Sequence, residues 1–170
     1  MITLTNAIQN ERVLISDCDK NFLSKWNWTK DNSHDYFYRQ KIDNDKVQHK
    51  TYLHRLVAQL KYKRKLKDNE CVDHADGNKY NNTRENIRIV TYKQNRINNN
   101  PLSSRTNTGF TGIYENKDNS FTVKVGKKTV GKYDSIEEAL YARLEYIYST
   151  YKIDIYERVR TAAATKEIYI

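Results

Sequence analysis

Cysteine is scarce in this chain. Cys18 and Cys71 are the only two among 170 residues, and they stand far apart. Structural zinc sites in small proteins usually rest on paired Cys-x-x-Cys motifs, which this sequence lacks. We therefore expect no structural zinc, and we expect both thiols to be reduced and buried as small apolar side chains.

Long apolar runs are also missing. No segment approaches the length that spans a membrane, and residues 1–10 contain neither a basic leader nor an apolar core. We expect a protein without a membrane partner that stays in the cytoplasm where it is made.

Acidic residues are outnumbered by basic ones. The sequence has 30 Lys and Arg against 21 Asp and Glu, a formal net charge of +9, and residues 1–100 carry most of the excess. This charge favours a polyanionic partner, although charge alone does not separate DNA from RNA or from an anionic membrane. The densest basic cluster lies in residues 61–67, where a phosphate-contact strip and a solvated helix end are equally good explanations.

Proline occurs once, at Pro101, in a stretch rich in Asn, Ser, Thr and Gly. This composition predicts a linker over residues 99–109. With 38% apolar residues, the chain can fill two small cores better than one large core. We expect an α+β protein with a first module over residues 1–98 and a second over residues 110–156.

Residues 71–78 begin the most informative segment of the chain. Cys71-Val72 is a short apolar stretch that predicts the end of a strand, so Asp73 and His74 should lie where the strand enters a loop. The Asp-Gly-Asn sequence at residues 76–78 predicts a turn with left-handed backbone angles. A carboxylate and an imidazole therefore meet at one strand end.

The next part of the segment predicts a second strand and a helix. Residues 87–90 alternate in polarity like a short half-buried strand, and Thr91 to Gln94 has the form of a capping box. A helix that starts at Thr91 places Asn95 just past its first turn. The order strand, loop, strand, helix lets Asp73, His74 and Asn95 converge.

These residues and their spacing resemble the HNH nucleases of phage and homing type, which are built on a ββα-metal motif. The resemblance implies that Asp73 and Asn95 ligate one divalent cation and that His74 is the general base for the attacking water. It also implies that Asn86, in Asn86-Ile87-Arg88, has a catalytic role by pinning the loop that orients this base. In isolation, His74 is better interpreted as a surface or hydrogen-bonded residue and Asn86 as a turn residue, and only the coupling of His74 to Asp73 and Asn95 favours catalysis.

The resemblance carries expectations about the reaction. An oxygen shell from Asp73, Asn95, phosphate and water favours Mg²⁺ or Mn²⁺ over zinc. Neutral His74 accepts a proton, so activity should fall in acid. We expect double-stranded DNA as the substrate and products with 5′-phosphate and 3′-hydroxyl ends. One motif gives one active centre, so a monomer should nick, and a cut through both strands needs a homodimer or a second binding event.

The sequence Tyr52-Leu53-His54-Arg55-Leu56-Val57 resembles a helix start of the same subgroup. For His54, a structural hydrogen bond or a phosphate contact is a better interpretation than catalysis. The DNA contacts expected in the first module and the linker are His54, Arg55, Arg88, Arg96 and Arg105.

The remaining part of the first module predicts a small scaffold. Residues 12–15 favour a strand, and Ser16 or Asp17 should cap a helix that ends near Trp26. Residues 36–42 and 47–53 favour a hairpin. Trp26 and Trp28 are interpreted as core residues.

The second module predicts a three-stranded antiparallel sheet packed on one helix. The strands are expected at about residues 110–115, 120–126 and 128–133, and a helix should run from the Ser135 cap to about Thr150. Its apolar stripe consists of Ile136, Leu140, Leu144 and Ile147. Lysines dominate the sheet and acidic residues dominate the helix, so the sheet should face DNA.

The stretches Gly109-Phe110-Thr111-Gly112-Ile113-Tyr114 and Val130-Gly131-Lys132-Tyr133 resemble the plant APETALA2-type DNA-binding domain. The resemblance implies DNA contacts from the sheet, for which the candidates are Tyr114, Lys117, Thr122, Lys124, Lys128 and Lys132. Lysines mostly contact phosphate, so base specificity should be modest. A plain solvated sheet is the alternative. Residues 157–170 resemble nothing known, and their alanine run fits a helix or a tail.

Together these patterns predict a metal-dependent DNA endonuclease of homing type from a phage-infected bacterial cell. A DNA-binding regulator with a silent nuclease site is the alternative. A third interpretation, an RNA-binding protein that stacks bases on its 14 tyrosines, leaves Asp73, His74 and Asn95 unexplained.

Overall fold

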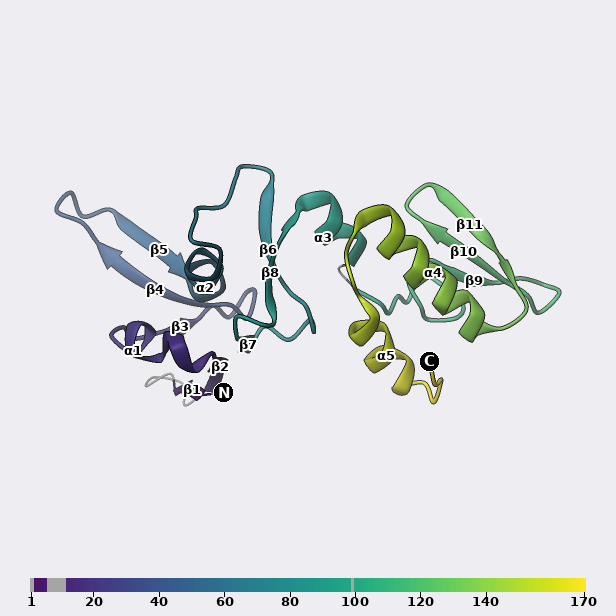
Figure 1. Ribbon diagram of the computed structural model, residues 1–170, viewed down its shortest axis with the longest axis horizontal. Helices are drawn as coiled ribbons and strands as arrows, with labels where there is room; N and C mark the ends of the chain where they lie inside the picture. The colour runs from purple at the N-terminus through teal and green to yellow at the C-terminus, as the bar shows by residue number, and fades with distance from the viewer. Residues whose placement is uncertain (1, 6–11, 99) are drawn as a thin grey trace. The chain divides into compact units, whose positions relative to one another are not determined.

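The computed structural model of the chain describes residues 2–5, 12–98 and 100–170 (Figure 1). The chain forms two compact units, Met1–Thr91 and Tyr92–Ile170. Residue 99, which falls in the predicted linker, lies outside the described residues. Both units mix helices with small sheets.

The described part of the first unit contains three small sheets. In the first sheet, β1 pairs antiparallel with β2, and β7 pairs parallel with β2. The second is the antiparallel sheet β3-β4-β5. In the third, β6 pairs antiparallel with β8. The strands are β1 (Ile2–Thr5), β2 (Arg12–Ile15), β3 (Thr29–Lys30), β4 (Phe37–Ile42), β5 (Gln48–Tyr52), β6 (Glu70–His74), β7 (Asn81–Asn82) and β8 (Ile87–Thr91).

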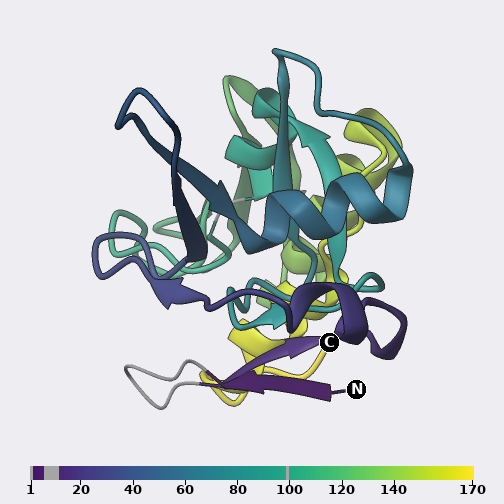
Figure 2. The ribbon, with the colours of Figure 1, turned by 90° about the vertical axis from the view of Figure 1, so that its left-hand side faces the viewer.

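Helix α2 (Leu53–Tyr62) is the centre of this unit, and it contacts strands of all three sheets (Figure 2). Its buried residues are spaced as on one helical face, so the helix supplies a continuous apolar stripe to the core. The buried core residues are Val13, Ile15, Leu23, Trp28, Phe37, Leu53, Val57, Ala58, Val72 and Ile87.

The predicted hairpin and the core role of the tryptophans are confirmed. β4 and β5 pair antiparallel, and Asp43 closes their turn by accepting bonds from the backbone of Asp45 and Val47. Trp28 is buried, and Trp26 packs against the core.

The helix predicted from Ser16 to Trp26 is too long. A 3-10 turn at Asp17–Asp19 leads into the single turn α1 (Lys20–Leu23). The hydroxyl of Ser16 does not cap this helix but donates to Glu85 and accepts from the backbone of Arg84. Long-range bonds therefore override the local capping signal.

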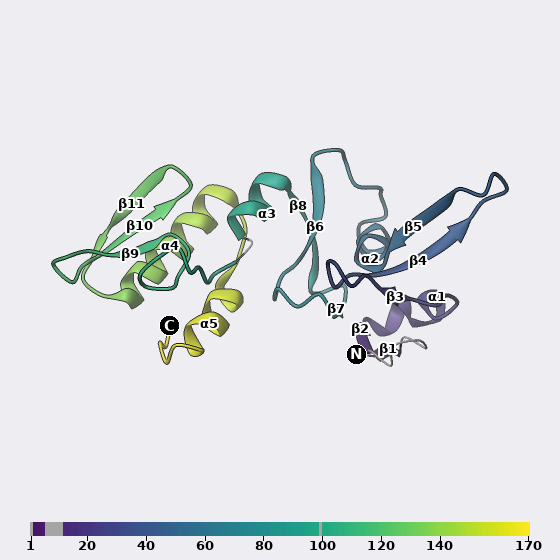
Figure 3. The ribbon, with the colours of Figure 1, turned by 180° about the vertical axis from the view of Figure 1, so that it is seen from behind.

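The second unit contains the sheet order β11-β10-β9, antiparallel throughout, with α4 lying along β10 and β11 (Figures 1 and 3). Ser135 caps α4 by accepting from the backbone of Glu138, as its sequence predicts. The elements are α3 (Tyr92–Asn98), β9 (Ile113–Glu115), β10 (Phe121–Val125), β11 (Lys128–Tyr133), α4 (Ile136–Tyr151) and α5 (Tyr156–Ala164).

In the second unit, one feature differs from the predicted apolar stripe, and another decides between the helix and the tail expected for the alanine run. The buried face of α4 includes Arg143 beside Leu140 and Ile147. Residues 156–164 form α5, whose Val159, Ala162 and Ala163 are buried. The alanine run is therefore a packed helix.

The cysteine prediction is half right, because Cys71 is buried while Cys18 is exposed. Both are free thiols. No helix within the described ranges is long and apolar enough to cross a membrane.

Candidate active site

His74 is the last residue of β6, and its imidazole is buried, with 4% of its surface exposed. The ring Nε2 lies 3.3 Å from Oδ1 of Asn82. The amide nitrogen of Asn82 donates to the carbonyl of Lys79, so the amide oxygen faces the imidazole, and Nε2 must be the donor. In that tautomer, Nδ1 is the ring nitrogen that can act as a general base.

Asn82 itself is fixed by strand pairing. It belongs to β7, which runs parallel to β2 in the register Ile15↔Asn82, and it is 2% exposed. In the sequence, Asn82 is interpreted as a loop or capping residue, and its contact with His74 is missed. Only the parallel pairing of two segments far apart in the chain brings it to the imidazole.

Asp73 precedes His74 and is also buried. In the antiparallel register it faces Arg88 of β8, whose Nε donates to Oδ2 of Asp73 at 2.8 Å. Arg88, predicted to contact DNA, is thus engaged by the predicted metal ligand. A cation at Asp73 has to share the carboxylate with this guanidinium.

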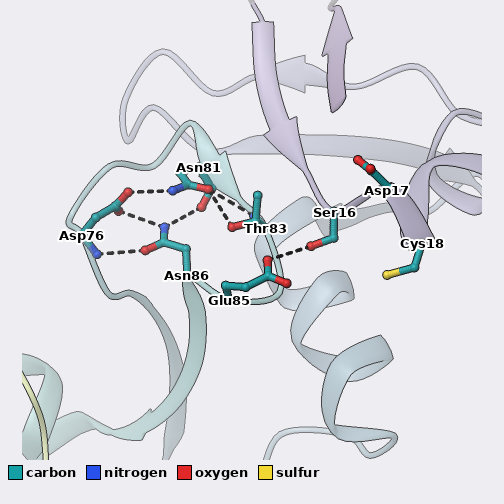
Figure 4. A pocket seen from close by; sticks show the side chains of 8 residues that line it. All are labelled: Ser16, Asp17, Cys18, Asp76, Asn81, Thr83, Glu85 and Asn86. Atoms are coloured by element: carbon teal, nitrogen blue, oxygen red, sulfur yellow. Dashed lines mark hydrogen bonds between the residues drawn. The ribbon is translucent and has the colours of Figure 1, made fainter. Parts of the chain in front are cut away.

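Asn86 bonds across the loop between β6 and β8 (Figure 4). Its Oδ1 accepts from the backbone N–H of Asp76 at 2.9 Å, while its Nδ2 donates to the Asp76 carboxylate at 2.9 Å and to the carbonyl of Asn81 at 2.7 Å. Asn81 in turn donates to the same carboxylate at 2.8 Å. We call Asp76, Asn81 and Asn86 the loop knot.

The loop knot holds the backbone on both sides of the turn. Gly77 has φ 79°, the left-handed conformation predicted for this turn. The backbone N–H of Ala75 donates to the carbonyl of Asn86 directly after His74. The exit of β6 is therefore tied to the entry of β8, and the imidazole is held at a fixed strand end.

A pocket of about 690 Å³ lies beside the loop knot. It is lined by Ser16, Asp17, Cys18, Asp76, Asn81, Thr83, Glu85 and Asn86 (Figure 4). Three of these side chains are carboxylates, which repel a phosphate backbone. His74 does not line the pocket. The pocket therefore lies on the outer side of the loop knot and is not the site of catalysis.

His54 lies beside His74, with ring centroids 5.8 Å apart, in a cluster with Tyr36 and Tyr52. Burial lowers the pKa of His54 to about 3, and the neighbouring His74 and Arg55 add to the effect. The imidazole is neutral at neutral pH and 7% exposed. It does not lie on the surface where a phosphate contact was predicted.

Asn95 lies half-buried on α3, in the second unit. Its amide and the carboxylate of Asp73 offer oxygen ligands, which suit a hard divalent cation such as Mg²⁺ or Mn²⁺. Across the described ranges, no group of three or more His, Cys, Asp or Glu side chains is placed to hold a metal ion. Each of these two side chains is, by itself, an oxygen donor of the kind that binds a hard cation.

Most remaining candidates for DNA contact lie at the surface. Arg55, Arg96, Arg105, Tyr114, Lys117, Lys124 and Lys128 are exposed. Two others are engaged within the sheet region, since Lys132 pairs with Asp118 at 2.6 Å and Thr122 bonds to Asn116. Both bonds compete with a DNA contact.

The basic cluster of residues 61–67 is partly structural. Lys61 donates to the carbonyls of Arg84 and Ile87, each at 2.7 Å, and Arg64 forms an ion pair with Glu70. This pairing lowers the pKa of Glu70 to about 2. At these positions the bonds favour a structural role over a phosphate strip.

Comparison with known proteins relates one segment of the chain to HNH endonucleases. Residues 51–97 match the family model described as HNH endonuclease. An uncharacterized HNH endonuclease of Acanthamoeba polyphaga mimivirus is 38% identical over 77 residues, which cover 45% of this chain and 40% of the viral protein. The chain thus matches less than half the length of that relative, and no solved structure matches it. The segment that carries Asp73, His74, Asn86 and Asn95 matches the HNH endonuclease family.

Proposed function

We propose that this protein is a metal-dependent DNA endonuclease of homing type. The observation that carries the proposal is His74, buried at the end of β6 beside Asp73 and oriented by Asn82, in a segment that matches the HNH endonuclease family. A fixed neutral imidazole next to a carboxylate is the arrangement that phosphodiester hydrolysis with a divalent cation requires.

In this mechanism His74 takes a proton from the attacking water at Nδ1. The bond from Nε2 to Asn82 holds the tautomer, and the loop knot keeps the imidazole at the strand end. Asp73 and Asn95 would hold one divalent cation, Mg²⁺ or Mn²⁺. When bound, the cation would neutralise negative charge on the phosphate and on the leaving 3′ oxygen. The expected products carry 5′-phosphate and 3′-hydroxyl ends.

The second unit would help to hold the DNA. Its sheet carries exposed Tyr114, Lys124 and Lys128, and the likeness of its sequence to APETALA2-type domains supports this role. Lysine contacts fix the protein on the backbone more than they read bases, so the site preference should be modest. We propose action in the cytoplasm of a bacterial host, as a monomer or homodimer.

The test uses supercoiled plasmid DNA with Mg²⁺ or Mn²⁺ and an EDTA control. We expect metal-dependent cleavage by the native protein, loss of cleavage in His74→Ala, and full activity in His34→Ala, which changes an exposed histidine of the same unit. If the native protein and His74→Ala both bind DNA but neither cuts, the silent regulator replaces the nuclease.

A further inference from the structure

Arg143 is a buried cation on the inner face of α4. It is 5% exposed, and its Nε has no hydrogen-bond partner among the described residues. Burial lowers the pKa of Arg143 to about 10, which leaves the side chain charged at neutral pH. A buried charge without a counterion is costly, so its position calls for an anion that the protein itself does not supply.

Arg143 lines a pocket of about 720 Å³ within the second unit. The other cations around this pocket are Lys93 and Arg96 of α3 and Lys124, Lys127 and Lys128 of the β10–β11 hairpin. No acidic residue lines it, and none of these six cations forms an ion pair in the described part of the chain. The pocket therefore combines one buried and five exposed positive charges.

Aromatic rings hold two of the lysines without cancelling their charge. The Nζ of Lys124 lies 5.5 Å from the ring centroid of Tyr114, and the Nζ of Lys93 lies 5.4 Å from that of Tyr151. Cation–π contacts of this kind orient an ammonium group while leaving its donors available. Both tyrosines line the pocket.

Gly112 forms part of the same wall. It has φ +75°, and its carbonyl accepts from the backbone N–H of Lys124 at 2.7 Å. A Cβ at this position would lie 3.5 Å from the Nε of Arg143 and would collide with the carbonyl of Lys124. The glycine thus lets β10 approach closely enough to form the pocket next to the guanidinium.

We propose that this pocket binds one phosphate group of a DNA backbone, with Arg143 at its base and the exposed lysines and Arg96 at its rim. The planar guanidinium fork matches two phosphate oxygens, and the lysines add point charges. The pocket is lined by cations and contains no Asn, Gln, Asp or Glu, so its charge suits the phosphate backbone, which every DNA sequence presents. The inference rests on the proposed function only in taking DNA as the source of the phosphate.

The test is fluorescence anisotropy of the full chain with a short labelled DNA duplex, in EDTA and over a series of salt concentrations. Arg143→Gln and Arg96→Gln should each weaken binding about fivefold to tenfold and reduce the slope of log affinity against log salt by about one. Arg160→Gln, which removes the same charge from α5 outside the pocket, should bind like the native chain. Circular dichroism checks that Arg143→Gln folds, and Arg96 is exposed, so its loss spares the core.

Two outcomes would overturn the proposal. One is native affinity and an unchanged salt slope in both Arg143→Gln and Arg96→Gln. The other is an equal loss in Arg160→Gln, which would reduce the effect to net charge. Inorganic phosphate is the second probe. If phosphate stabilises the native chain but not Arg143→Gln against unfolding, while Arg143→Gln binds DNA with native affinity, the pocket is a site for free phosphate. The binding measurement is made in EDTA, where no cleavage takes place. It therefore tests the pocket even if the chain proves unable to cut DNA.

Discussion

At the scale of single residues, a hydrogen bond to Asn82 helps to orient the imidazole of His74. Asn82 accepts from Nε2, and its own amide is fixed by the carbonyl of Lys79. An imidazole that lost this acceptor could place its proton on Nδ1, the nitrogen assigned to the attacking water. Asn82 is therefore a positioning residue, since it acts through His74.

Asn82→Ala should lower kcat by about 10-fold to 100-fold, which is part of the roughly 100-fold to 10,000-fold that a general base contributes. KM for DNA should change little, because Asn82 is buried away from the surface. Cleavage kinetics with plasmid substrate measure both constants. Asn44→Ala, at an exposed turn position, is the matched control. A rise in KM with unchanged kcat would contradict the positioning role.

His54 makes stability depend on pH. Its pKa of about 3 in the folded chain lies below that of an unfolded imidazole, so the unfolded chain binds more protons over the range between these values. Stability is therefore complete above the unfolded pKa and falls as the pH drops toward the folded one. Between pH 7 and pH 5 this loss amounts to about 2 kcal/mol.

His54→Phe should flatten this dependence, because the ring still fills its place beside Tyr36 but no longer titrates. Urea unfolding at several pH values measures the free energy of unfolding. His34→Phe, which changes an exposed histidine, should keep the native slope. An equally steep slope in His54→Phe would assign the acid sensitivity to other groups, among them the neighbouring His74.

At the scale of elements, the loop knot joins β6 to β8. Asn86→Ala removes three hydrogen bonds and should cost roughly 2–3 kcal/mol of stability. Asn86→Asp should cost more, because it places a second carboxylate against Asp76. The double variant Asp76→Asn with Asn86→Asp restores a donor to the pair and should recover part of this loss. Thermal unfolding of the native chain and the three variants measures these stabilities. A double variant no more stable than Asn86→Asp would show that the bond between residues 76 and 86 is unimportant.

The sequence predicts the elements whose signals are local. The β4–β5 hairpin, the cap at Ser135 and the turn at Gly77 each depend on a few neighbouring residues, and all three are found. Asn86 was singled out by the resemblance to HNH nucleases, because its local pattern alone fits a turn residue. The hairpin, the cap and the turn follow from short-range chemistry.

Other positions depend on contacts between distant segments, which no local pattern encodes. Ser16 has the form of a helix cap but bonds to Arg84 and Glu85. Arg143 occupies a helix face that should be apolar, because a pocket accommodates its charged end. Arg88 was predicted to contact DNA, but the antiparallel pairing of β6 and β8 places it opposite Asp73.

At the scale of the whole molecule, the chain has one candidate centre for cutting. The Asp-His pair occurs once in the sequence, within the segment that matches the HNH endonuclease family. Hydrolysis of one phosphodiester bond by one general base cuts one strand per binding event. A protein that acts as a monomer must therefore bind twice to cut both strands.

We expect supercoiled plasmid to become nicked first and linear DNA to appear only after a lag, at a rate proportional to protein concentration. A gel time course at several protein concentrations measures both steps. If the second unit holds DNA and the first cuts it, as proposed above, Arg143→Gln should slow both steps through weaker binding at low protein concentration. His74→Ala should abolish both steps at every concentration. Linear product without a nicked intermediate, at a rate that rises with the square of the concentration, would instead identify a dimer whose two His74 residues cut opposite strands.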